Sequence, residues 1–185
     1  MLRSPTHSAD AFDVNQLRDP ETGLYNEVFY TASVPTRVAA AKRALRPLSV
    51  VVIAAAGLRA VELVGALERT VREADLACRL DHGRFGVLLE ETPAEGAVRM
   101  VERFGRALGE PDGAVQVWAG IAAYPIDALD GVALLQAADA ALREAMASGR
   151  SKIQLAADLA VAPPARPATL TPAWAPVASE GTSTQ

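Results

Sequence analysis

The sequence predicts an α/β sandwich in which helices cover both faces of a mostly antiparallel sheet. Three observations support this prediction. Short apolar runs typical of strands alternate along the chain with segments whose apolar residues recur at helical spacing. Two of the strand-like runs are separated by only a few residues, which predicts a hairpin and therefore an antiparallel pair. Half of the 185 residues are hydrophobic, enough for one domain with a packed core.

The first part of the chain predicts a helix, a strand and a second helix. Turn-forming residues at 18–25 lead to Asn26, a good cap for a helix that runs to about Leu45. Pro35 lies inside this helix and is expected to kink or restart it, because its ring removes a backbone donor. Residues 48–56 form an apolar run rich in β-branched side chains, typical of a buried central strand. Apolar residues then recur at helical spacing from 58 to 71.

A hairpin follows, and the rest of the chain is organised around it. Alternate residues are expected to point inward before and after the turn: Leu76, Cys78, Leu80, Phe85, Val87 and Leu89. The turn is Asp81-His82-Gly83-Arg84. Arg72 and Asp75 stand just before the first strand, three positions apart. They offer a rigid guanidinium donor and a carboxylate acceptor close together.

The remaining elements are a helix, a strand, a helix and a short edge strand. Pro93 opens a helix over 93–108, and residues 114–122 form a strand. A helix over 132–146 ends near Gly149, and residues 153–155 suit an edge strand.

The domain is therefore expected to span 17–156. Residues 1–16 are predicted to be a loose tail or a short lead-in helix, and 157–185, rich in Ala, Pro, Ser and Thr, a disordered tail. Trp174 in that tail is either an exposed aromatic or a docking anchor for a partner.

Composition limits the function classes. The net charge of −4 and the pI of about 5.2 argue against general binding of nucleic acid or of an anionic membrane, which needs a basic face. Cys78 is the only cysteine, so no internal disulfide can form, which fits a cytoplasmic location. No apolar run reaches the roughly 18 residues of a membrane helix. Residues 1–15 lack the apolar segment of a secretory signal.

Three motifs stand in a fixed order along the chain. They are Asp19-Pro20-Glu21-Thr22-Gly23-Leu24-Tyr25-Asn26, the segment 72–85, and Ala138-Asp139-Ala140-Ala141-Leu142 followed by Gly149-Arg150-Ser151. With these motifs, residues 17–156 resemble a GGDEF domain, the diguanylate cyclase family. The resemblance implies a cyclase-like sheet and, in active members, condensation of two GTP molecules into cyclic di-GMP.

The positions that the resemblance assigns to catalysis are changed. The signature Gly-Gly-Asp/Glu-Glu-Phe is here Asp81-His82-Gly83-Arg84-Phe85, so Gly83 and Arg84 replace the metal-binding and catalytic acids. Further matched positions also lose their function: Ala54 and Ala56 replace the acids of the first strand, Met146 replaces a phosphate-contacting lysine, and a Phe-Lys-x-x-Asn-Asp stretch is missing. Magnesium needs oxygen ligands, and phosphoryl transfer needs positioned metals and cations. We therefore expect a degenerate domain with no catalytic residues, no metal site and no cyclase activity.

A second site is retained. Arg72 and Asp75 resemble the family's product-binding Arg-x-x-Asp motif, with the family's spacing to the signature, and Arg103 matches its second arginine. The chemistry suits guanine: an arginine fork donates to the O6/N7 edge, and a carboxylate accepts from the N1 and N2 protons. The sequence therefore predicts a cyclic di-GMP receptor with no other cofactor. Whether Arg72 and Arg103 act in one chain or across a homodimer stays open.

Other interpretations stay open as well. Arg72 and Asp75 could form an ordinary exposed ion pair, worth at most about 1 kcal/mol. The domain could instead be a ligand-free interaction module whose altered turn contacts a signalling protein. An enzyme of another kind has no supporting cluster. His82 is read as a solvated loop residue, Cys78 as a packing residue, Asp139 as a helix cap or structural acid, and Arg150 as either a phosphate contact or a surface charge.

Overall fold

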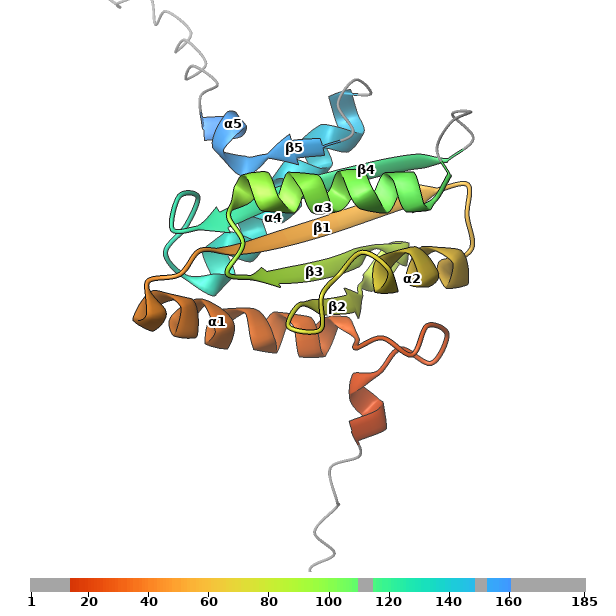
Figure 1. Cartoon of the computed structure of the whole chain (residues 1–185), viewed down its shortest axis with the longest axis horizontal. Helices are drawn as coiled ribbons and strands as arrows, with labels where there is room; N and C mark the ends of the chain where they lie inside the picture. The colour runs from red at the N-terminus through yellow and green to blue at the C-terminus, as the bar shows by residue number, and fades with distance from the viewer. Residues whose placement is uncertain (1–13, 110–114, 149–152, 161–185) are drawn as a thin grey trace, which may run out of the picture.

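The structure is a computed structural model that describes residues 14–109, 115–148 and 153–160 (Figure 1). Within these residues one sheet has the strand order β2-β3-β1-β4-β5. The strands are β1 (Leu48–Ala56), β2 (Leu76–Arg79), β3 (Phe85–Glu90), β4 (Gln116–Tyr124) and β5 (Ile153–Leu155). All neighbours pair antiparallel except β4 and β5, which are parallel. The predicted mostly antiparallel sheet is therefore confirmed.

Helices lie on both faces of this sheet, as the sequence predicts. They are α1 (Glu27–Ala44), α2 (Ala60–Glu68), α3 (Ala94–Ala107), α4 (Gly131–Ser148) and the short α5 (Ala156–Ala160). Buried residues of α1 and α4 pack on one face, and those of α2 and α3 pack on the other. In Figure 1, α3 crosses in front of β1 and β4 while α4 lies behind them. No helix in the described part of the chain is long and apolar enough to cross a membrane.

The hairpin differs from its prediction in one respect. Its apolar residues are buried, but the two strands direct them to opposite faces of the sheet. Cys78 pairs with Gly86 and faces α1 and α4, whereas Phe85 and Val87 face α2 and α3. β3 is buried along nearly its whole length, because it lies between β2 and β1 and is covered on both faces. Alternation alone does not reveal this, since both faces are apolar.

The N-terminal helix α1 begins and continues for identifiable reasons. The side chain of Asn26 accepts a hydrogen bond from the backbone N–H of Phe29 at 3.1 Å, so the predicted cap is confirmed. The expected restart at Pro35 is wrong, because α1 continues through this residue. Tyr30, Val34 and Val38 are buried on one face of α1, so packing against the sheet holds both halves in one helix.

The predicted domain limits fall inside short helices. Val14–Leu17 is a 3-10 helix, which fits the lead-in helix considered for this segment. At the other end, α5 begins at Ala156 and extends beyond the predicted start of the disordered tail. Ala156 is buried and Leu159 packs against the core, which explains why this segment is helical. Gly149, Arg150 and Trp174 lie outside the described residues.

Replacing Leu45 by glycine is expected to stabilise the domain by about 0.5–1 kcal/mol. Leu45 caps the C-terminus of α1 in the left-handed region at φ 52°, and it is 88% exposed. Glycine adopts this conformation without steric cost, and little packing is lost. Urea denaturation measures the free energy of unfolding. Leu45→Ala is the control, and a glycine variant no more stable than the alanine variant would contradict the prediction.

Candidate functional site

Arg72, Asp75 and Arg103 line one surface pocket. The segment before β2, the turn after β3 and the exposed side of α3 form its walls. Its volume is about 230 Å³. The structure therefore brings together, in one chain, the three residues that the sequence singled out as a ligand site.

Asp75 and Arg72 form a tight turn through their backbones. Oδ2 of Asp75 accepts a hydrogen bond from the backbone N–H of Arg72 at 2.9 Å, and the N–H of Asp75 donates to the Arg72 carbonyl at 3.0 Å. No ion pair joins the two side chains among the described residues. The ordinary ion pair considered from the sequence is thus not formed. The exposed guanidinium of Arg72 is open to a ligand.

The helix α3 contributes two arginines to the pocket. Nη2 of Arg103 donates to the carbonyl of Thr70 at 3.3 Å, which ties α3 to the segment before β2. Arg99 lies one turn earlier and also lines the pocket. Arg99 was not among the site residues predicted from the sequence. Its spacing of four from Arg103 was the available signal, because such residues share one face of a helix.

The turn between β2 and β3 is held by contacts at both ends. The backbone N–H of Asp81 donates to Oε2 of Glu27 at 2.8 Å, and Nη1 of Arg79 donates to the carbonyl of Gly83 at 2.7 Å. His82 and Gly83 have φ values of 57° and 78°. Asp81 and His82 are exposed, as the solvated-loop interpretation of His82 expects.

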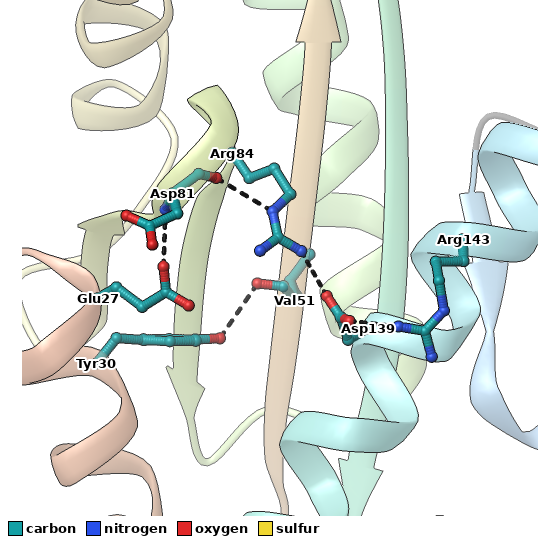
Figure 2. A network of polar contacts seen from close by, with 7 residues as sticks. All are labelled: Glu27, Tyr30, Val51, Asp81, Arg84, Asp139 and Arg143. Atoms are coloured by element: carbon teal, nitrogen blue, oxygen red, sulfur yellow. Dashed lines mark hydrogen bonds and ion pairs between the residues drawn. The ribbon is translucent and has the colours of Figure 1, made fainter.

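Arg84 in this turn is paired with an acid on α4 (Figure 2). Its Nη1 lies 2.6 Å from Oδ1 of Asp139, and the other oxygen of Asp139 lies 2.6 Å from Nη1 of Arg143. Nε of Arg84 also donates to the Asp81 carbonyl at 3.2 Å. Asp139 is therefore a structural acid in mid-helix, and the alternative reading as a helix cap is wrong. The structure places a cation, not a carboxylate, at this position of the turn.

We next consider which side chains near the turn could bind a metal ion or react as a nucleophile. Ala54 and Ala56 at the end of β1 carry no polar side-chain atom. Among the described residues no group of three or more His, Cys, Asp or Glu side chains is arranged to hold a metal ion. Cys78 is fully buried, and burial raises the pKa of its thiol to about 12, so it is a packing residue.

Tyr30 of α1 packs against strand β3 of the hairpin. Its ring lies against Gly86, where an added Cβ would come within 2.7 Å of a ring carbon. Its hydroxyl donates to the Val51 carbonyl at 3.4 Å (Figure 2). Burial raises the pKa of Tyr30 far above its usual value, so the phenol stays neutral. A larger residue than glycine at position 86 would push α1 away from the sheet.

Comparison with known proteins decides the family. Residues 60–152, half of the chain, match the family described as "Diguanylate cyclase, GGDEF domain". The chain belongs to the GGDEF family. No curated protein sequence matches this GGDEF domain.

Solved GGDEF domains share its fold. That of TpbB (YfiN) from Pseudomonas aeruginosa is 24% identical with a TM-score of 0.68, over 75% of this chain and 94% of the other. That of DgcB from Caulobacter crescentus, solved with c-di-GMP, is 16% identical with a TM-score of 0.67, over 76% of this chain and 96% of the other. Diguanylate cyclase SiaD from P. aeruginosa, solved with its activator SiaC, is 24% identical with a TM-score of 0.65, over 75% and 61%.

Proposed function

We propose that this GGDEF domain is a cytoplasmic receptor for cyclic di-GMP and has no cyclase activity. One observation carries the proposal: Arg72, Asp75 and Arg103 gather around one pocket, while the signature turn is occupied by the Arg84–Asp139 ion pair. The GGDEF domain of DgcB was solved in complex with c-di-GMP, which makes this ligand a natural choice.

The chemistry of the pocket suits this ligand. Cyclic di-GMP carries two guanines and two anionic phosphates. Arg72, Arg99 and Arg103 supply guanidinium donors for phosphate oxygens and for the O6/N7 edge of guanine. Oδ2 of Asp75 is used by the Arg72 backbone, so Oδ1 is the oxygen that would accept from the N1 and N2 protons of guanine.

The size of the pocket defines how the ligand would sit. Its volume of about 230 Å³ is smaller than the roughly 300–1,000 Å³ of sites that enclose a drug-sized ligand. One guanine with its phosphate would therefore fill the pocket, and the rest of the dinucleotide would lie on the exposed arginines. Such a partly open site is compatible with a second ligand molecule or a second chain completing it.

The proposed lack of activity rests on charge at the signature turn. An active site for phosphoryl transfer between nucleotides concentrates carboxylates around divalent metals. Here the guanidinium of Arg84 binds one oxygen of the Asp139 carboxylate on α4, and Arg143 binds its other oxygen. A metal ion would have to displace two arginines from Asp139. Ala54 and Ala56 would provide no further ligand.

Two measurements on the purified full chain test the proposal. Calorimetric titration with cyclic di-GMP is expected to give saturable binding, and titration with GTP and magnesium is expected to give none at the same concentrations. Incubation with GTP and magnesium is expected to give no cyclic di-GMP by chromatography, with an active cyclase as positive control. Absence of heat with cyclic di-GMP would end the receptor proposal, and product formation would end the proposal of inactivity.

A protein-interaction module is the second candidate, and one observation favours it. Ile126 and Leu129 on the connection from β4 to α4 are 74% and 64% exposed, and Val132 in the first turn of α4 is 56% exposed. Leu129 and Val132 line a cleft with Pro35 and Val38 of α1. SiaD, a structural neighbour, was solved with a protein activator. If cyclic di-GMP does not bind, a signalling protein that docks on this surface or on the exposed turn becomes the better explanation.

A further inference from the structure

We propose that the ion pair of Arg46 and Glu91 sets the affinity of the pocket for cyclic di-GMP and links the pocket to the end of α1. The inference rests on the proposed function, because it concerns the same ligand at the same site. Glu91 lines the pocket, whereas Arg46 lies behind Glu91 and lines the neighbouring pocket between α1 and β3.

Glu91 is held at the rim of the pocket by its neighbours. The Oγ of Ser49 donates to the Thr92 carbonyl at 2.8 Å, and Oγ1 of Thr92 donates to the Glu90 carbonyl at 2.7 Å. Arg37 of α1 forms an ion pair with Glu90. Glu91 itself adopts a φ of 48°. The backbone of the turn after β3 is therefore fixed from both sides, which keeps residue 91 at the rim of the pocket.

The charge of Glu91 opposes an anionic ligand. Glu91 and Asp75 are the acidic residues among the described residues that line the pocket, and Asp75 is matched to the base edge of guanine. An unpaired Glu91 would repel the phosphates and compete with them for Arg72 and Arg99. Nη1 of Arg46 lies 2.7 Å from Oε2 of Glu91 and offsets this charge from outside the pocket. Arg46 thereby favours the ligand without touching it.

Arg46 is placed by the end of α1. It follows Leu45, the left-handed cap residue, and its backbone N–H donates to the Ala41 carbonyl at 3.0 Å. A shift of the end of α1 away from β3 would separate Arg46 from Glu91. The pocket would then become more negative and bind cyclic di-GMP more weakly. This gives α1 a physical route to regulate the site.

A mutant cycle measured by cyclic di-GMP titration tests the inference. Both side chains are more than half exposed, at 58% and 60%, so the effects are expected to be moderate. Arg46→Gln is expected to weaken binding about two- to fivefold. Glu91→Gln is expected to bind at least as tightly as the wild type, and the double variant is expected to match Glu91→Gln. Raising the salt concentration is expected to shrink these differences.

The control is Arg43→Gln, which removes an exposed arginine from the last turn of α1 and is expected to leave the Kd unchanged. Equal Kd values for the wild type and Arg46→Gln would overturn the inference but leave the receptor function intact. A double variant as weak as Arg46→Gln would also overturn it, because Arg46 would then act independently of Glu91. Absence of wild-type binding would overturn the receptor function itself.

Discussion

Gly120→Ala is expected to lower the free energy of unfolding by about 3 kcal/mol. Gly120 lies in β4 where α4 crosses the sheet. An added Cβ would come within 2.1 Å of the Ala138 carbonyl oxygen and 2.2 Å of the Leu142 backbone nitrogen. Both neighbours are helix backbone, so no side-chain rotation can relieve the clash. The whole of α4 must move away from β4, and the core packing of Ala138 and Leu142 is lost with it.

Gly65→Ala is the matched control for this prediction. Gly65 lies inside α2, and its added Cβ would meet only the flexible end of Arg69, at 3.5 Å. Alanine is the better helix former, so this variant is expected to gain about 0.5–1 kcal/mol. Urea denaturation of both variants gives opposite signs if the packing argument is right. A Gly120→Ala protein as stable as the wild type would show that α4 is not held against β4 as described.

Arg72→Ala is expected to weaken cyclic di-GMP binding about tenfold or more, which is the largest functional effect that we predict. The guanidinium of Arg72 is exposed at the pocket and forms no ion pair within the described residues, so its donors are available to the ligand. Charge-assisted hydrogen bonds to guanine or phosphate are among the strongest that a side chain can make. Arg103→Ala is expected to act in the same direction.

Two neighbouring arginines provide matched controls. Arg69 precedes the pocket and donates to the Ala107 carbonyl, and Arg106 lies on α3 and donates to the Glu102 carbonyl. Alanine at either position removes the same charge near the same elements without removing a pocket residue. Isothermal titration calorimetry on the four variants distinguishes specific contacts in the pocket from long-range attraction by positive charge. Equal weakening in all four would show that only long-range charge attracts the ligand, and the specific site would be rejected.

Local sequence signals predicted most of the fold. Asn26 could be recognised as a cap because capping depends on residues three positions apart. The central strand Leu48–Ala56 could be recognised because a continuous apolar run of that length suits a strand buried on both faces. The continuity of α1 through Pro35 could not be predicted, because it depends on packing against the sheet and α4. The opposite facing of the two hairpin strands also depends on which elements cover each face.

The residues of the candidate site were likewise only partly predictable from the sequence. Register with the signature turn was enough to select Arg72, Asp75 and Arg103. By contrast, the sequence did not reveal that Arg99 and Glu91 line the pocket. This depends on the tertiary structure, which places α3 and the turn after β3 beside the segment before β2. Glu91 could not be paired with Arg46 from the sequence, since 45 positions separate them.

The sequence by itself determined the order of helices and strands, the GGDEF resemblance and the presence of Gly83 and Arg84 in the turn, because each depends on residue types at short, fixed spacings. Only the tertiary structure decided which charges meet. Arg84 and Asp139 are 55 positions apart, and their pairing follows from α4 lying across β1 and β4 beside the turn. Ionic contacts of this kind carry no periodic signal in the chain, since they form wherever packing brings two side chains together.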